Sequence, residues 1–266
     1  MRKENGMCRI PDGMKWSFSK LEAFHHCGMM FKLVYLDHAE KEGNGFSDYG
    51  TFCHKLLEEW AKGQIPDFAL AEEYQERYDD EVVNAFPPFP RGMPQKYYDQ
   101  GLQYFENFDG FGDDYEILTV EEKFEIEIDG YILVGIADLT LRNKKTGGIV
   151  VIDHKSKSKN SMKKEYETFR MQLYTYAMFV KQKYGVYPEK LIFNMFREQN
   201  FISEDFDMDM YNKTRQWIVD TIHEIEACRD WIISSSSFFC RYVCSVFDSC
   251  PARDAVLFGN KKNEEE

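Results

Sequence analysis

Hydrophobic side chains in the N-terminal part of the chain recur at the three- to four-residue spacing of amphipathic helices. Ser19-Lys20-Leu21-Glu22 fits a capping box, which predicts that a helix begins there and runs to about Asp37. The same spacing predicts three more helices, over Asp48–Ala61, Asp67–Ala85 and Met93–Phe108.

The spacing changes to an alternation of apolar and polar residues in Ile117–Arg142, which predicts strands. Phe124–Ile128 alternates apolar and charged residues, and Asp129-Gly130 is a strong signal for a hairpin turn. Tyr131–Arg142 then forms the returning strand. A third strand, Ile149–Asp153, is almost entirely apolar before its last residue, as expected of a strand that is buried on both faces.

Beyond this three-stranded meander we expect a long helix, a further strand and another helix broken by Ser234–Ser237. Their predicted ranges are Met162–Tyr184, Lys190–Arg197 and Asp207–Ile233. This order predicts an α/β fold, in which helices flank a mixed β-sheet. We expect one domain over residues 1–259, with an N-terminal helical region (16–110), a core (115–200) and a C-terminal helix with a cysteine-rich segment (205–251), and a disordered tail at 260–266.

Composition is that of a globular protein, with 43% hydrophobic and 30% charged residues. No apolar run reaches the roughly 18 residues that a membrane span needs, and no apolar segment of a signal peptide follows the basic N-terminus. We therefore expect a cytoplasmic protein without a membrane partner.

The net charge of −13 counts against a nucleic-acid partner, but a site that gathers carboxylates around a cation offsets this argument. The lysine-rich stretch Lys155–Lys164 contains no acid, and it follows a candidate catalytic strand. Either it is a solvated loop, or it contacts phosphates. Its candidate nucleic-acid-binding residues are Lys157, Lys159, Lys163 and Lys164.

Two aspartates and a lysine are the central chemical signal. Asp138 and Asp153 lie on consecutive strands whose spacing can bring both carboxylates to one end of the sheet, and Lys155 projects from the same face as Asp153. Both carboxylates and the backbone carbonyl of His154 can bind a hard divalent cation, and the lysine can stabilise developing negative charge. Charged residues also end many strands for structural reasons alone, but here a buried strand runs straight into the acid.

These residues resemble the D-x(n)-D-x-K arrangement of the PD-(D/E)XK nucleases, and more specifically their RecB-like exonuclease branch, which includes CRISPR-associated exonucleases. Further motifs of that branch occur in the same order: Ser17–Leu21 with Cys27, Gly50-Thr51-Phe52-Cys53-His54, Val120-Glu121-Glu122-Lys123-Phe124 and Gln172-Leu173-Tyr174-Thr175-Tyr176. The resemblance covers about residues 16–251. It implies a restriction-endonuclease-like core.

The resemblance also implies roles for single residues. His54 would be an additional metal ligand, although a lone histidine among apolar neighbours is usually structural, and the mixed ligand set would accept Mg²⁺ or Mn²⁺. Glu121 would assist at the metal, although Glu122 competes for this role from the opposite face. Gln172 and Tyr176 share a helix face, where they would contact the DNA backbone, brace the lysine or simply pack.

Seven cysteines in a reducing compartment do not indicate disulfides. Cys240, Cys244 and Cys250 cluster near the C-terminus, and with Cys27 they resemble the iron–sulfur members of the same branch, which implies a [4Fe–4S] cluster. The first gap is one residue longer than the common family spacing, so a zinc site and four reduced thiols remain alternatives. Cys8, Cys53 and Cys228 are expected to be ordinary thiols.

Together these patterns favour a metal-dependent DNA exonuclease of DNA recombination, repair or processing. It would act on DNA ends or single strands, and a helicase, a recombinase or another DNA-processing protein would be its partner. The alternatives are a catalytically silent DNA-binding or assembly subunit and a structure- or site-specific endonuclease. A redox enzyme is disfavoured, because no dinucleotide-binding G-x-G-x-x-G follows a strand.

Overall fold

The computed structural model describes residues 10–259, which form two compact units. The sheet unit contains Gly45–Ile126 and Val134–Arg215. The terminal unit contains residues 10–44, Glu127–Leu133 and residues 216–259. The predicted tail at 260–266 and Cys8 lie outside the described residues.

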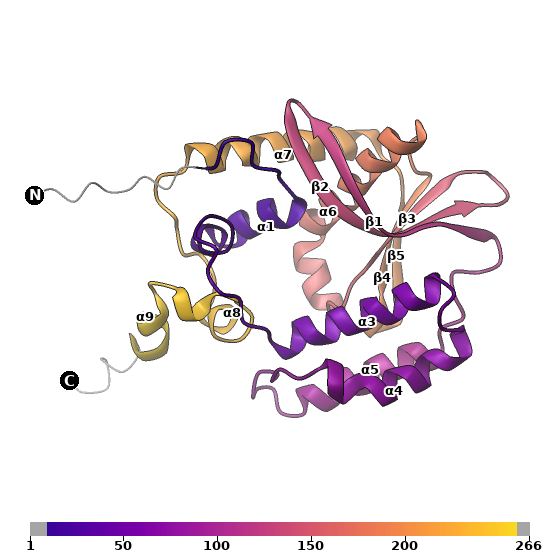
Figure 1. Ribbon diagram of the computed structural model, residues 1–266, viewed down its shortest axis with the longest axis horizontal. Helices are drawn as coiled ribbons and strands as arrows, with labels where there is room; N and C mark the ends of the chain where they lie inside the picture. Colours follow the sequence, from indigo (N-terminus) through magenta and orange to yellow (C-terminus); the bar gives the residue numbers. More distant parts are fainter. Residues whose placement is uncertain (1–9, 260–266) are drawn as a thin grey trace, which may run out of the picture. The chain divides into compact units, whose positions relative to one another are not determined.

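A five-stranded mixed sheet organises the sheet unit, in the order β1 (Tyr115–Ile128), β2 (Tyr131–Asn143), β3 (Ile149–His154), β4 (Lys190–Met195) and β5 (Asn200–Asp205). β2 and β3 are antiparallel, β3 and β4 are parallel, and β4 and β5 are antiparallel. Parallel neighbours need a long crossover, which α6 (Lys159–Tyr184) provides (Figure 1). The predicted α/β class and the mixed sheet are confirmed.

Local sequence explains the centre of this sheet. All six residues of β3 are buried, as its apolar sequence predicts. Asp129 and Gly130 both have a positive φ, of 51° and 87°, as a two-residue turn between β1 and β2 requires. On one face of the sheet Leu139, Leu141, Val150 and Ile152 form a buried apolar cluster.

Three helices of the sheet unit run side by side, namely α3 (Gly45–Ala61), α4 (Leu70–Glu81) and α5 (Met93–Glu106) (Figure 1). A short 3-10 turn, Asp67–Ala69, precedes α4. Tyr74 is fully buried between them and stacks on Phe52 at 5.5 Å between ring centroids. Gly101 makes this packing possible, because a β-carbon there would lie 2.4 Å from the Tyr74 hydroxyl oxygen. α4 and α5 thereby support α3 through this packing.

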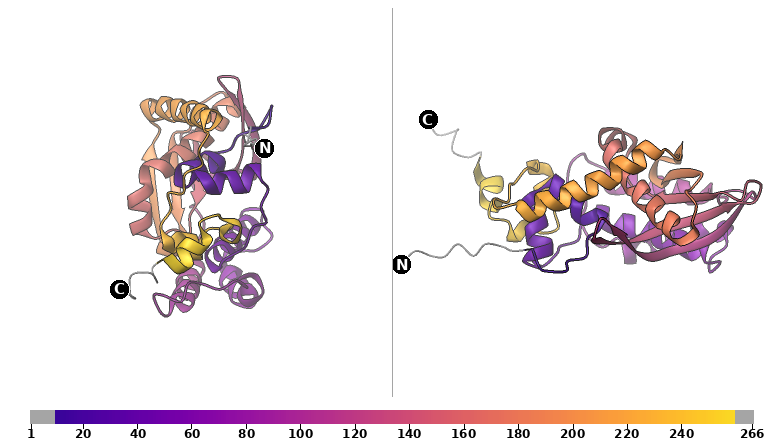
Figure 2. Two further views of the ribbon diagram at one scale, coloured as in Figure 1. Left: turned by 90° about the vertical axis from the view of Figure 1, so that its left-hand side faces the viewer. Right: turned by 90° about the horizontal axis from the view of Figure 1, so that it is seen from above.

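The terminal unit begins with α1 (Phe18–His26), α2 (Gly28–Phe31) and a π-helical turn, Lys32–Leu36. α7 (Met208–Ala227) lies beside α1 in both views of Figure 2. The two helices are in contact, because His25 Nε2 lies 2.8 Å from Thr221 Oγ1. The chain then forms three short helical elements, which are α8 (Ser237–Tyr242), the 3-10 turn Phe247–Ser249 and α9 (Arg253–Phe258).

The first helix differs from its prediction at both ends. Its N-cap is Ser17 rather than Ser19, because the Ser17 hydroxyl accepts the backbone N–H of Lys20 at 3.3 Å. The helix ends at Cys27, whose extended backbone (φ −162°) separates α1 from α2. The predicted continuous helix to Asp37 is therefore wrong.

Other boundaries also differ. α4 ends at Glu81 rather than Ala85, β4 ends at Met195 rather than Arg197, and α7 ends at Ala227 rather than Ile233. β5, α8 and α9 were not predicted, because elements of only six residues carry little periodic signal. No helix within residues 10–259 is long and apolar enough to cross a membrane.

Candidate active site

The two aspartates meet where β2 and β3 end their pairing. Leu139 pairs with Ile152, and the same register continued by one residue places Asp138 opposite Asp153. Asp138 Oδ2 accepts the backbone N–H of His154 at 2.8 Å, so its carboxylate is fixed to the end of β3. Asp138 is 9% exposed and Asp153 only 1%.

Lys155 is held within a network of side chains. Its Nζ lies 2.6 Å from Asp153 Oδ2 and donates to Gln172 Oε1 at 2.8 Å. Gln172 Nε2 donates to the Tyr176 hydroxyl at 2.8 Å, and the charge of Asp153 adds to burial in raising the pKa of Tyr176. Of the three roles that the sequence left open for Gln172 and Tyr176, these contacts match bracing of the lysine.

A second group of side chains can hold a cation. His54 on α3, Glu121 on β1 and Asp138 on β2 each offer one ligand atom, and the three atoms all lie within 4.8 Å of one another. Glu121 reaches this group because its backbone has a φ of 49° inside a strand, an uncommon conformation for a residue with a side chain. Glu122 instead pairs with Lys183 at 2.6 Å.

Burial raises the pKa of each of the three acids. It raises the pKa of Glu121 to about 7, with the Asp138 charge as a further cause. It raises the pKa of Asp138 and of Asp153 to about 6, while Lys155 opposes both increases. The Asp138 charge also raises the pKa of Asp153, so burial and neighbouring carboxylates outweigh the counter-charge of Lys155.

The His54 imidazole is suited to bind a metal through a neutral nitrogen. Burial is the main cause that lowers its pKa to about 4; Lys155 contributes, and Asp153 opposes the change. His54 Nδ1 lies 3.7 Å from Asp138 Oδ2, and the backbone of His154 opposes the lowering of the His54 pKa. The carbonyl of that backbone is the one predicted as a ligand.

The donor set fits a single divalent cation. When all three carboxylates are ionised and His54 is neutral, three carboxylates and one ammonium leave two negative charges, which one such cation would balance. Oxygen ligands with one imidazole nitrogen suit Mg²⁺ and Mn²⁺. Asp153 was predicted as a ligand, but within the described residues it is not part of the group of three. Its carboxylate is the partner of Lys155.

Behind the site, a buried polar network fixes the side chain of His154. Its Nδ1 lies 3.0 Å from Asn194 Nδ2, which also donates to the Tyr104 hydroxyl at 2.7 Å. The backbone carbonyl of Asn194 accepts the N–H of Lys155 at 2.8 Å. This network was not predicted from the sequence. An asparagine in the apolar strand β4 is its signal there.

The four predicted nucleic-acid-binding lysines lie after β3. Lys159, Lys163 and Lys164 are exposed in the first turns of α6. Lys157 lies 3.0 Å from Glu165 and 4.1 Å above the ring of Phe169. Three of the four are therefore exposed to solvent, whereas Lys157 contacts other side chains.

Four cysteines come together in the terminal unit. Cys27, Cys240, Cys244 and Cys250 line one apolar cavity with Leu33, Phe239 and Phe247 among others. Burial raises the pKa of the Cys240 and Cys244 thiols, and the nearby cysteines add to both increases. Elsewhere, Cys53 is fully buried, and the partly exposed Cys228 donates to the Asp230 carbonyl.

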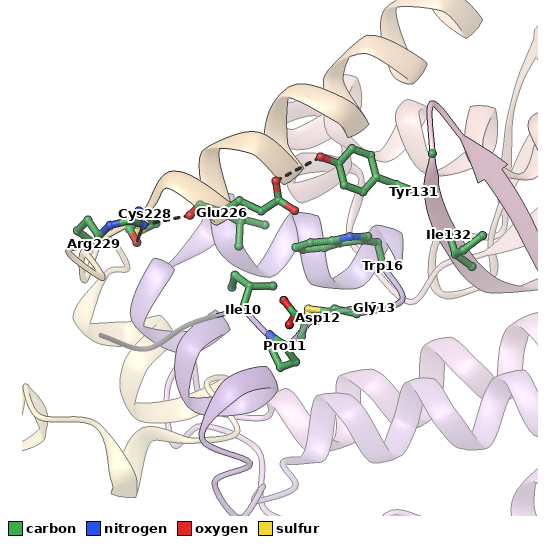
Figure 3. Close-up of a pocket in the computed structure, with 13 residues that line it drawn as sticks. Ile10, Pro11, Asp12, Gly13, Trp16, Tyr131, Ile132, Glu226, Cys228 and Arg229 are labelled. Carbon is green, nitrogen blue, oxygen red and sulfur yellow. Dashed lines mark hydrogen bonds between the residues drawn. The ribbon is translucent and has the colours of Figure 1, made fainter. Parts of the chain in front are cut away.

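A separate pocket of about 680 Å³ lies in the terminal unit (Figure 3). It is formed by the loop around Trp16, the tip of the β1–β2 hairpin and the end of α7, where Tyr131 donates to Glu226 at 3.2 Å. None of the predicted site residues lines it. Despite its size, we therefore do not assign this pocket as the candidate active site.

Comparisons with known proteins give a family. A sequence model of the PD-(D/E)XK nuclease superfamily matches residues 15–251. No curated protein sequence matches the chain significantly. Similar solved structures include SSO0001, with 21% identity over 85% of this chain and 95% of that chain and a TM-score of 0.34. Another, a "Putative exonuclease" from Eubacterium rectale, has 9% identity over 88% and 87% of the two chains and a TM-score of 0.46.

Proposed function

Since the chain belongs to the PD-(D/E)XK nuclease superfamily, we propose that it is a metal-dependent deoxyribonuclease that hydrolyses phosphodiester bonds. The observation that carries this proposal is the convergence of Asp138, Asp153 and Lys155 at one end of β2 and β3. A catalytically silent subunit would have no chemical need for all three residues in this geometry.

Each residue has a distinct part in hydrolysis. His54, Glu121 and Asp138 would hold the cation, together with the His154 carbonyl. When bound, a divalent cation supplies Lewis-acid chemistry, which lowers the pKa of water and neutralises charge on the phosphate. Lys155, fixed by Asp153 and Gln172, would orient the attacking water or donate to the phosphate oxygen where negative charge develops.

We further propose exonuclease action on DNA ends or single strands, in recombination, repair or DNA processing. The motif set of the RecB-like branch supports this narrower assignment. The exposed lysines 159, 163 and 164 would contact the strand, and a helicase or recombinase would provide the opened substrate.

A nuclease assay on end-labelled linear DNA and on circular DNA of the same sequence tests this proposal. With Mg²⁺ or Mn²⁺ we expect cleavage of linear DNA and little cleavage of the covalently closed circle. Equal cleavage of linear and circular DNA would indicate an endonuclease rather than an exonuclease. No cleavage of either DNA, in either metal and in single- or double-stranded form, would refute the nuclease.

We also propose that the four clustered cysteines bind a [4Fe–4S] cluster. All four cysteines line one apolar cavity, which supports a metal group that they share. Such a cluster would join two segments that already touch, since Ser234 Oγ donates to the His26 carbonyl at 2.7 Å.

Iron and acid-labile sulfide analysis of protein purified without oxygen tests this cofactor. We expect a brown protein with visible absorption, and we expect Cys244→Ser to lose it. Cys228→Ser is the matched control and should retain it, because Cys228 lies outside the cavity. Colourless protein with zinc, or with no metal, would refute the cluster.

A further inference from the structure

Arg197, which follows β4, has a buried guanidinium whose hydrogen bonds are incomplete. Its side chain is only 9% exposed. Nη1 donates to the Tyr97 hydroxyl and to the Ser156 carbonyl at 3.4 Å, and the guanidinium stacks over the Tyr97 ring at 4.4 Å. Its Nε–H is buried and has no hydrogen-bond partner. Leaving such a donor unpaired costs free energy, so the arrangement needs an explanation.

The charge of Arg197 is also poorly balanced compared with that of other arginines in the sheet unit. Arg170 Nε and Nη2 lie 3.1 and 2.7 Å from the two carboxylate oxygens of Glu204. Arg77 holds Glu59 in the same two-point manner, at 2.6 and 3.2 Å. Within residues 10–259 Arg197 has a single ion pair, with Glu198 at 3.4 Å, although its side chain is the most buried of the three. The least exposed guanidinium therefore has the weakest counter-charge.

The weakly balanced charge of Arg197 lies close to the candidate active site. Ser156, whose carbonyl it contacts, directly follows Lys155. Phe196, its chain neighbour, packs edge-on against the His54 ring at 5.9 Å. One helical turn before His54, Gly50 leaves the backbone of α3 uncovered above Ser156, since a β-carbon there would lie 3.3 Å from Ser156 Oγ.

We infer that Arg197 binds a phosphate of the nucleic-acid strand adjacent to the phosphate that is cut, with the Ser156 hydroxyl as a second donor. A phosphodiester supplies the anionic charge that would balance this guanidinium. Arg197 thereby positions the strand and takes no part in bond cleavage. This inference rests on the proposed function, because it concerns the substrate of the same site.

Salt dependence of DNA binding distinguishes this role from a purely structural one. Each phosphate contact to a single strand contributes about 0.7 to the slope of log affinity against log salt. A short fluorescent single-stranded oligodeoxynucleotide, titrated with the full chain without added divalent cation, gives that slope. For Arg197→Gln we expect a slope smaller by about 0.7 and roughly tenfold weaker binding at low salt.

Arg77→Gln is the matched control, since it removes the same charge from an arginine whose partners are Glu59 and Glu73. It should retain the wild-type slope. In cleavage assays Arg197→Lys and Ser156→Ala should raise KM with little change in kcat. If Arg197→Gln fails to fold, a raised KM in these two variants supports the role, and a wild-type KM in both overturns it.

Failure of this inference is separable from failure of the proposed function. If the wild-type chain cuts DNA while Arg197→Gln retains its slope and KM, Arg197 is only a structural clamp between Tyr97 and Ser156. If the wild-type chain neither binds nor cuts DNA under any condition, the nuclease assignment itself is refuted.

Discussion

Replacing Asp138 by asparagine should stabilise the metal-free protein at alkaline pH. The pKa of this buried carboxyl rises from 3.8 to about 6, which corresponds to about 3 kcal/mol against the ionised form in the folded state. Asparagine removes the charge, and its side-chain carbonyl can still accept the backbone N–H of His154. We therefore expect metal-free Asp138→Asn to be more stable than wild type by up to about 3 kcal/mol at pH 8.

The pH dependence follows from the direction of that pKa change. Because the folded pKa lies above the unfolded one, the cost of the ionised carboxylate is complete above pH 6, and it fades as the pH falls toward 3.8. The gain from the substitution should therefore be large at pH 8 and small at pH 4. Thermal unfolding measures it, with an expected rise in Tm on the order of 6–12 °C at pH 8.

Bound metal should make wild type more stable than Asp138→Asn. At a Mn²⁺ concentration about one thousand times the dissociation constant, wild type gains about 4.1 kcal/mol, which exceeds the advantage of metal-free Asp138→Asn, and the variant should gain little. Asp205→Asn, at an 89% exposed side chain, is the control and should change stability by less than about 0.5 kcal/mol. Equal or lower stability of metal-free Asp138→Asn at pH 8 would refute the claim that the site is held under electrostatic strain.

Three further predictions concern the surroundings of the same site. Gln172→Leu should lower kcat by about 10- to 100-fold with little change in metal affinity, because the amide only fixes Lys155; a wild-type kcat would contradict this role. Mn²⁺ binding, measured by calorimetry, should weaken as the pH falls below 7, where protons compete for Glu121, and Glu121→Gln should reduce this dependence. Gly101→Ala should cost about 1–3 kcal/mol by crowding Tyr74, and unchanged denaturant unfolding would disprove that contact.

Features set by local pattern were predictable from the sequence. The Asp129-Gly130 turn joins β1 to β2. The apolar strand that ends in Asp153 pairs with β2, and this register brings Asp138 opposite Asp153. The place of His54 followed from a family motif rather than from its apolar surroundings, which alone would have indicated a structural histidine.

Features set by tertiary packing were not predictable. Glu121 has a positive φ within β1, and a glutamate at that position does not indicate such a backbone conformation. Asn194 acts on His154 only because β4 lies parallel to β3, and β5 exists as a strand only through its pairing with β4. The helix from Ser19 was misplaced because Ser17 and Ser19 both have capping side chains, and packing selects between them.

Cleavage by Lys155→Met is the most direct test of the central claim, that one cation site and one lysine perform phosphodiester hydrolysis. Wild type and variant would be compared in Mn²⁺ on the same labelled DNA, together with their Mn²⁺ affinity and unfolding temperature. We predict that cleavage falls by at least about a thousandfold, while folding and metal binding persist. Cleavage by Lys155→Met at the wild-type rate would contradict the claim.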